Sequence, residues 1–282
     1  MTNGSTSNVE AGAVRIGPDQ PLTIIAGPCV FESLEVGRRV ADAIAPVCRR
    51  LGLGYIYKAS FDKANRSSIT SYRGPGLTTA LKWFETIRSE FGCPLTTDIH
   101  EPAHAGAAAE AIDLLQIPAF LSRQTDLLLA AGEAAAKHGR AVNVKKGQFM
   151  APAEMAGPIN KLAEAGCTNT MLTERGTFFG YHRLVNDFTG LGDLLELGPP
   201  VCFDVTHSTQ LPGSGTQTGG RPERAPLLAR AATAAGVHAL FIEAHPDPAN
   251  AKSDGATVMD IETAVGVIES AARIRDALTP VS

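Results

Sequence analysis

The stretch Gly-Tyr-Ile-Tyr-Lys-Ala-Ser-Phe-Asp-Lys-Ala-Asn-Arg-Ser-Ser, at residues 54–68, contains the pattern that decides the fold. It begins with a short apolar run typical of a buried strand and continues with two lysines, an arginine, an asparagine and three serines. Ammonium, guanidinium, hydroxyl and amide groups suit an anionic, hydroxylated small molecule. A solvated surface loop can have the same composition. However, ligands of α/β folds bind beyond the carboxyl ends of strands, which is where this run lies.

The same alternation of a β-rich run and an Ala-rich stretch continues along almost the whole chain. It predicts strands at residues 22–26, 54–58, 95–98, 114–117, 141–145, 170–173, 201–204 and 239–243. It predicts helices at residues 35–51, 77–91, 103–111, 125–138, 153–165, 186–196, 224–235 and 259–278. Eight such units are typical of a TIM (β/α)8 barrel, which we expect as a single domain at residues 21–282. A doubly wound open sheet is the alternative, because periodicity does not show closure.

Composition narrows the class of protein. The 282 residues carry a net charge of -4, which argues against a nucleic-acid binder because phosphate contacts need a basic face. No apolar run approaches the roughly 20 residues that span a bilayer. Residues 1–20 are expected to form a disordered or loosely ordered tail without a signal peptide. The five widely spaced cysteines fit reduced thiols, so we expect a cytoplasmic protein.

Nearly every predicted strand ends in a charged or reactive residue, and in a barrel these ends converge on one face. The residues are Cys29, Lys58, Asp98, Gln116, Lys145, Arg175, Asp204 with His207, and Glu243 with His245. The candidate anion-binding cations are Lys58, Lys63, Arg66, Arg123, Lys145, Lys146 and Arg175. Such a density of cations requires a multiply charged ligand to offset its own repulsion. Because side chains alternate along a strand, Lys145 and Lys146 should point in opposite directions.

A second set of residues has the donor atoms of a divalent-metal site. Cys29, His207 and Glu243 follow the first, seventh and eighth predicted strands, which are neighbours in a closed barrel, and Asp254 lies in the loop after the last. Thiolate, imidazole and carboxylates together suit Zn²⁺, Fe²⁺, Mn²⁺ or a similar ion. Taken alone, a cysteine such as Cys29 is more often a buried apolar residue than a ligand. His245 could also replace His207.

Seven short motifs follow one another along the chain. They are KASFDKANRSS (58–68), SYRGPG (71–76), TDIHEP (97–102), RQTD (123–126), NVKK (143–146), FDVTH (203–207) and FIEAHPD (241–247). With these motifs the chain resembles the 3-deoxy-D-manno-octulosonate 8-phosphate synthase family over about residues 22–278. The resemblance implies an enzyme of lipopolysaccharide core biosynthesis that condenses phosphoenolpyruvate with D-arabinose 5-phosphate and water and releases inorganic phosphate. It also implies a homotetramer in which a neighbouring subunit contributes to the site.

Two rival functions remain beside this one. The related synthase that uses erythrose 4-phosphate typically has Lys-Pro-Arg-Thr where this chain has Lys63-Ala-Asn-Arg66, which favours the five-carbon sugar. A non-catalytic phosphosugar-binding barrel is the rival of another class.

The resemblance also implies a cofactor. One branch of the family has asparagine at the position of Cys29 and works without metal, whereas the other has cysteine and requires a divalent ion. Ser253 supports the metal-dependent branch, because the metal-free branch usually has cysteine there. The implied metal ligands are Cys29, His207, Glu243 and Asp254. Whether such an ion would activate the attacking water or orient the aldehyde stays open.

Finally, the resemblance implies roles for the cations. Lys145 and Arg175 would hold the phosphoenolpyruvate phosphate, with Arg123 nearby. Lys58 and Lys63 would lie between the two substrates. The remaining substrate-binding residues would be Asn65, Arg66, Ser67 and Gln116. The catalytic set would be Lys63, Lys58, Cys29 and His207.

Overall fold

A computed structural model describes residues 8–65, 69–213 and 219–278. Its central strands are β3 (Thr23–Gly27), β4 (Gly54–Lys58), β5 (Leu95–Asp98), β6 (Leu114–Ile117), β7 (Ala141–Lys145), β8 (Thr170–Glu174), β11 (Val201–Asp204) and β14 (Ala239–His245). Each strand pairs in parallel with the next, and β14 pairs with both β11 and β3. The sheet is therefore closed, which confirms the predicted TIM barrel and rules out the open sheet.

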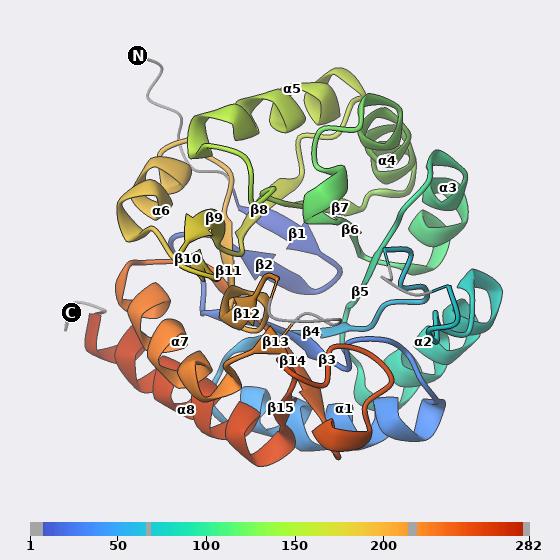
Figure 1. The fold of residues 1–282 in the computed structure, drawn as a ribbon. Coiled ribbons are helices and arrows are strands. Elements are labelled where there is room, and N and C mark those ends of the chain that lie inside the picture. The colour runs from blue at the N-terminus through green and yellow to red at the C-terminus, as the bar shows by residue number, and fades with distance from the viewer. Residues whose placement is uncertain (1–7, 66–68, 214–218, 279–282) are drawn as a thin grey trace.

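In the part of the chain that the structure describes, eight helices surround the barrel as a ring (Figure 1). They are α1 (Leu34–Arg50), α2 (Leu77–Phe91), α3 (Pro102–Ala111), α4 (Thr125–His138), α5 (Ala156–Glu164), α6 (Phe188–Leu195), α7 (Ala225–Ala234) and α8 (Ile261–Leu278). Local signals set their ends: the Ser33 hydroxyl accepts a hydrogen bond from the Val36 N–H, and Gly139 ends α4 in the left-handed region. None of the helices among the described residues is long and apolar enough to cross a membrane.

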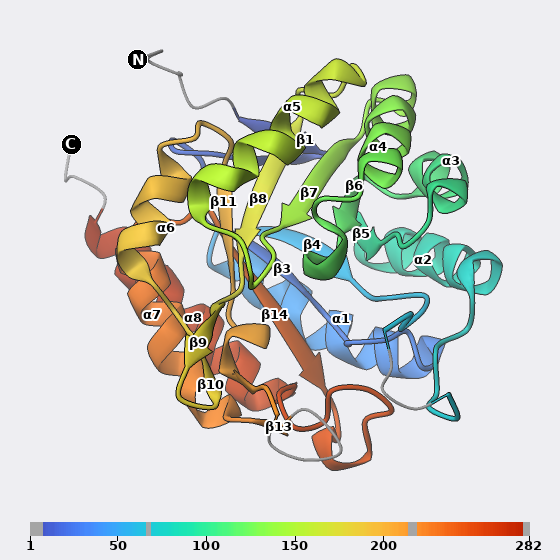
Figure 2. The same ribbon diagram turned by 45° about the horizontal axis from the view of Figure 1, so that its top comes forward.

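Short strands and 3-10 turns lie at the two ends of the barrel. The strands are β1 (Val9–Ala11), β2 (Val14–Ile16), β9 (Thr177–Gly180), β10 (Arg183–Val185), β12 (Gln210–Leu211), β13 (Gly219–Gly220) and β15 (Met259–Asp260). The 3-10 turns are η1 (Ala119–Leu121), η2 (Pro152–Met155), η3 (His207–Thr209), η4 (Pro222–Arg224) and η5 (Pro248–Asn250). All except β1 and β2 belong to connections that follow a barrel strand. Figure 2 shows β1 at the opposite end of the barrel from β9, β10 and β13.

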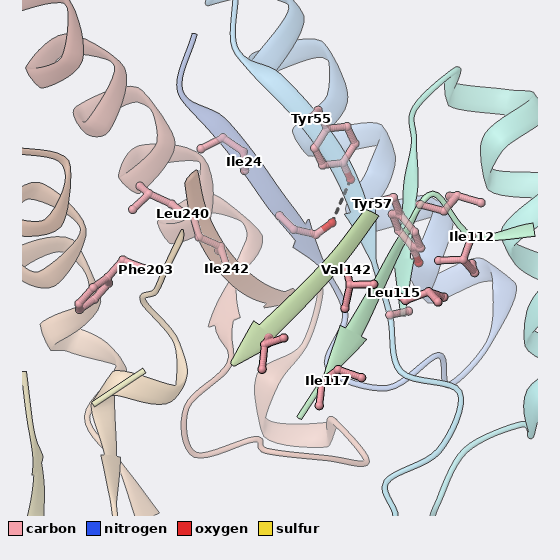
Figure 3. Packing of buried hydrophobic residues seen from close by; sticks show 14 of the residues in the cluster. Ile24, Tyr55, Tyr57, Ile112, Leu115, Ile117, Val142, Phe203, Leu240 and Ile242 are labelled. Carbon is pink, nitrogen blue, oxygen red and sulfur yellow. Dashed lines mark hydrogen bonds between the residues drawn. The ribbon is translucent and has the colours of Figure 1, made fainter. Parts of the chain in front are cut away.

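Alternation along the strands divides the core into two layers. Outward side chains such as Ile24, Tyr55 and Leu240 pack against the helices (Figure 3). The inward layer fills the barrel and consists of Ile25, Ile56, Leu114, Ala141, Met171, Cys202, Ala239 and Phe241, together with Val9, Ala11 and Ile16. The interior of the barrel is thus a packed core, and it is apolar toward the amino-terminal ends of the strands.

Part of the segment expected to be a loosely ordered tail has regular structure, at residues 9–16. Strands β1 and β2 form an antiparallel hairpin with Val9 opposite Ile16. The side chains of Val9, Ala11 and Ile16 are buried against the inward layer of the barrel. The hairpin covers apolar side chains that the amino-terminal end would otherwise expose to water. Residues 1–7 lie outside the described residues.

Candidate active site

Polar residues continue the inward-facing series at the carboxyl ends of the strands. Two residues beyond Ile56 lies Lys58, two beyond Cys202 lies Asp204, and two beyond Phe241 lies Glu243. The same spacing of inward positions gives Gln116 on β6 and Lys145 on β7. All five are buried. On these five strands the inward face therefore changes from apolar to polar toward the carboxyl end.

Two buried ion pairs lie at this level, and each joins strands that have one strand between them: β4 with β14, and β7 with β11. Lys58 Nζ lies 2.6 Å from Glu243 Oε1 and also donates to the Cys29 carbonyl at 3.0 Å. Lys145 Nζ lies 2.6 Å from Asp204 Oδ2. Burial lowers the pKa of Lys145, although Asp204 opposes that shift. For Glu243 burial acts to raise the pKa, but Lys58 and other nearby cations outweigh it and hold the pKa below its usual range.

An aromatic ring lies beneath the two ammonium groups. Lys145 Nζ is 3.5 Å and Lys58 Nζ is 5.2 Å from the centre of the Phe241 ring. The face of an aromatic ring attracts cations, and the attraction is stronger where water is excluded. Phe241 therefore helps to hold the two ammonium groups at this level of the barrel.

Arg175 brings a guanidinium to the same region from the segment after β8. Its Nη2 donates to Gln210 Oε1 at 2.5 Å. Its Nη1 is buried and has no partner among the described residues. Burial lowers the pKa of Arg175 although several carboxylates, Asp204 first, oppose the shift. An unpartnered buried donor is costly, so this group is suited to an anion that completes its hydrogen bonds.

A thiol and two carboxylates gather beside Lys58. The ligand atoms of Cys29, Glu243 and Asp254 lie within 4.8 Å of one another. Cys29 Sγ is 3.0 Å from Asp254 Oδ2, and Asp254 has a left-handed φ of 50 that is uncommon for a residue other than glycine. Glu243 Oε2 is buried without a hydrogen-bond partner among the described residues. This orphaned oxygen and the thiol-carboxylate donor set fit a divalent cation.

His207 lies at the edge of this cluster. Its Nε2 is 3.7 Å from Glu243 Oε2, and its Nδ1 is 2.8 Å from Asp204 Oδ2. A carboxylate on one ring nitrogen orients the other nitrogen, as is usual for a metal-binding histidine. His245 instead accepts a hydrogen bond from the Asp247 N–H at 3.0 Å, which is the loop-capping arrangement.

Lys63 lies half-buried in the segment after β4 and donates to Ser60 Oγ at 3.0 Å. Burial opposes its charge, but the acidic groups around it, Cys29, Glu243, Asp98 and Asp254, outweigh burial and raise the pKa of Lys63. Burial raises the pKa of the Cys29 thiol well above the ordinary range, and the charges of Asp254 and Glu243 add to this increase. The thiolate that a cation needs would thus form as the cation binds.

Other predicted residues lie away from this cluster or outside the description. Asn65 and Arg123 are exposed. Gln116 is buried on β6 and accepts a hydrogen bond from Asn143 Nδ2 at 3.4 Å. Arg66 and Ser67 lie outside the described residues.

The structure gives a role to Asp204, which the sequence placed only among the strand ends, and it adds Phe241, which the sequence did not single out. Asp204 contacts both Lys145 and His207, and Phe241 lies beneath the two lysines. The signal that could have found Phe241 is the two-residue spacing on β14, where it continues the inward series that Ala239 begins. Lys145 and Lys146 do reach different partners, although both are buried.

A closed barrel with ionisable groups gathered at the carboxyl ends of its strands defines the class, a TIM-barrel enzyme. The chain belongs to the DAHP synthetase I family, whose pattern it matches over residues 4–276. It is similar to proteins named 2-dehydro-3-deoxyphosphooctonate aldolase. The one from Synechococcus sp. is 50% identical over 264 residues, 93% of this chain and 92% of that protein. Those from Koribacter versatilis and Caulobacter vibrioides are 49% and 50% identical, over 92% and 94% of this chain and 93% and 91% of theirs.

Proposed function

We propose that the protein condenses phosphoenolpyruvate with D-arabinose 5-phosphate and water to give 3-deoxy-D-manno-octulosonate 8-phosphate and inorganic phosphate. The observation that carries the proposal is the unpartnered Nη1 of Arg175 in the same cluster as the buried ammonium of Lys145. A phosphate would supply the acceptor that this donor lacks. Relatives that are 49–50% identical to this chain are named 2-dehydro-3-deoxyphosphooctonate aldolase, and this name supports the choice of product.

In this function the cationic side chains bind the two substrates and orient them for reaction. Lys145 and Arg175 hold the phosphoenolpyruvate phosphate, because a guanidinium and an ammonium match its charge. Lys58 and Lys63 lie between the two substrates, and both carry positive charge toward the carboxylate and the aldehyde end. Lys63 stabilises the negative charge that develops on the aldehyde oxygen, since the anionic groups around it favour its protonated form.

For these bond changes the protein mainly has to place the two substrates next to each other. The C3 carbon of phosphoenolpyruvate attacks the aldehyde carbon, so that a carbon–carbon bond forms and positive charge develops at C2. Water adds at C2 and loses a proton, and the aldehyde oxygen gains one. The resulting hemiketal phosphate loses phosphate by cleavage of its C–O bond. Because both substrates are anions held by fixed cations, proximity supplies much of the rate.

The residues present fit the metal that the resemblance implies. Cys29, His207, Glu243 and Asp254 would hold a divalent ion, of which Zn²⁺, Fe²⁺ and Mn²⁺ are candidates. Such an ion supplies Lewis-acid stabilisation of negative charge on oxygen. Lys58 would then share Glu243 with the ion and keep that carboxylate oriented through Oε1.

The sugar phosphate would bind at the outer rim of the site. Asn65, Arg66 and Ser67 form the proposed set for this substrate, whereas Arg123 is proposed to lie near the phosphoenolpyruvate phosphate, and Gln116 is a further substrate-binding residue inside the barrel. Because Asn65 and Arg123 are exposed in one chain, we propose a homotetramer in which a neighbouring copy completes the rim. The five cysteines are free, which suits the proposed cytoplasmic location.

The deciding experiment measures phosphate release from phosphoenolpyruvate in the presence of either aldose phosphate. We expect release with arabinose 5-phosphate and release at least about tenfold slower with erythrose 4-phosphate, because the phosphate of a shorter sugar cannot reach the same cations. A preference for erythrose 4-phosphate would support the related synthase instead. Binding of phosphoenolpyruvate without any release would support the non-catalytic barrel.

The metal proposal is tested by metal content as well as by activity. We expect purified protein to contain about one divalent ion per chain, and Cys29→Ala to lose it, because the thiolate is the softest ligand of the set. Cys48→Ala is the matched control, since Cys48 is buried in the helix layer, away from the cluster. Elemental analysis gives the ion content directly. Equal ion content in wild type and Cys29→Ala, or full activity after chelation, would contradict the site.

A further inference from the structure

A buried lysine and a buried glutamate form a pair behind the predicted phosphate site. Lys146 is 1% exposed and Glu174 is 4% exposed. Lys146 Nζ lies 3.4 Å from Glu174 Oε2 and donates to the Met150 carbonyl at 3.2 Å and Thr177 Oγ1 at 3.1 Å. Two hydrogen bonds and the ion pair with Glu174 thus hold the ammonium of Lys146 in place.

The pair lies on the side of the barrel wall away from Lys145. Lys145 follows the inward series of β7, and Lys146 is the next residue, so its side chain leaves from the other face. Glu174 likewise has the outward position at the end of β8, two residues beyond Leu172, which packs in the helix layer. The two consecutive lysines therefore do different things: one reaches into the site and one supports its wall.

Glu174 holds the backbone from which Arg175 projects. Its Oε1 accepts hydrogen bonds from the Arg175 N–H at 2.8 Å and the Gly176 N–H at 2.7 Å. Gly176 has a φ of 91, in the left-handed region, and turns the chain into the β9–β10 hairpin. A charged acceptor on two consecutive N–H groups makes strong hydrogen bonds. The direction in which the Arg175 side chain leaves the wall is therefore fixed by the Glu174 carboxylate.

We propose that the Lys146–Glu174 pair is a positioning device that aims the Arg175 guanidinium at the substrate phosphate. Glu174 fixes the backbone of Arg175, Gln210 holds Nη2, and Nη1 is left for the ligand. Lys146 neutralises the carboxylate so that it can remain buried. The inference rests on the proposed function, because that function assigns Arg175 to the phosphate of phosphoenolpyruvate.

The test measures phosphoenolpyruvate binding by calorimetry in the absence of the sugar phosphate. Glu174→Leu removes the acceptor of both N–H groups, and we expect its Kd for phosphoenolpyruvate to rise at least about tenfold, since small misplacements cost up to about 100-fold. Its KM for arabinose 5-phosphate should stay within about twofold. Lys146→Met combined with Glu174→Gln removes both charges and keeps an amide oxygen for the two N–H groups, so binding should recover to within about threefold of wild type.

A double-mutant cycle shows whether the effect acts through Arg175. In an Arg175→Met background, Glu174→Leu should weaken binding by less than about twofold further, because the group that it positions is gone. An unchanged Kd in folded Glu174→Leu, or an equal further loss in the Arg175→Met background, would overturn the proposal. If Glu174→Leu does not fold, Glu174→Gln is measured instead. This variant leaves the charged Lys146 beside an uncharged amide and should raise the Kd for phosphoenolpyruvate about threefold. An unchanged Kd would contradict the proposal.

Arg140→Met is the matched control for a merely structural role. Arg140 pairs with the buried Asp113 at 3.1 Å, at the amino-terminal end of the barrel. Its replacement should lower the thermal midpoint and leave the Kd for phosphoenolpyruvate unchanged.

The behaviour of the wild type distinguishes a failure of this proposal from a failure of the proposed function. Wild type that binds phosphoenolpyruvate but releases no phosphate contradicts the proposed function alone, whereas wild type that does not bind it contradicts both proposals.

Discussion

His238 lies at the amino-terminal end of β14, where its Nδ1 accepts a hydrogen bond from the Val201 N–H at 2.9 Å. Burial, and then the charge of Arg275, lower the pKa of His238 to about 4. The pKa of an unfolded histidine is about 6.5, so between these values the unfolded chain binds a proton that the folded chain excludes. The stabilisation from neutral His238 is therefore complete above about pH 6.5 and is lost as the pH falls toward 4.

We expect His238→Asn to reduce this loss, because the amide oxygen can accept the Val201 hydrogen bond and does not titrate. Between pH 7 and pH 5 the free energy of unfolding of wild type should fall by about 2 kcal/mol more than that of the variant. Urea unfolding at the two pH values measures both. Above pH 5 most carboxylates remain ionised in both states, so they contribute little to the difference. Equal losses in the two proteins would contradict the assignment.

Single residues also show the limit of sequence reasoning about the site. The strand-end positions of Lys58, Lys145 and Glu243 could be predicted because a period of two is visible in the sequence. Their partners could not, since pairing depends on how the side chains of different strands meet inside the closed barrel. Asp204 illustrates this: it contacts a lysine from β7 and a histidine from its own loop. Only the three-dimensional structure reveals that double role.

At the scale of elements, the N-terminal hairpin closes the apolar end of the barrel. We expect Ile16→Ala to lower the free energy of unfolding by about 2–5 kcal/mol, because it removes a fully buried side chain from the layer that includes Ile25 and Ile56. Chemical unfolding measures the loss. Arg15→Ala on the exposed side of the same strand is the control and should change stability by less than about 0.5 kcal/mol. Equal effects would mean that the hairpin does not seal the core.

The long elements and the hairpin differed in how well they could be predicted. Five of the eight barrel strands begin and end at the predicted residues, and the others differ by one or two. Helix α5 is shorter than predicted because residues 152–155 form the 3-10 turn η2. The hairpin was missed because each of its strands has three residues, too few for alternation to stand out. Tertiary packing, not local pattern, determines such short strands.

At the scale of the whole molecule, the two ends of the barrel have separate tasks. The amino-terminal end carries the hairpin and the Asp113 ion pairs with Arg88 and Arg140, which are structural. The carboxyl end carries the ionisable cluster and the connections β9–β10 and η1. Large aromatic side chains are exposed in those connections: Phe179 and Tyr181 are each 93% exposed, and Phe120 is 52% exposed. Exposed aromatic side chains of this size are candidates for contact with another copy of the chain.

This surface leads to a prediction about assembly. We expect light scattering to give wild type four times the chain mass of 29.5 kDa, and Phe179→Ser with Tyr181→Ser to shift the mass toward smaller species. Each aromatic ring can bury roughly 150–250 Å² in a contact, so its loss weakens the contact by several kcal/mol. Leu278→Ser is the control, because Leu278 is also exposed but lies at the end of α8. If the neighbouring copy completes the sugar-phosphate rim, the KM for arabinose 5-phosphate should rise as the assembly dissociates. A monomeric wild type with full activity would refute both the tetramer and the shared site.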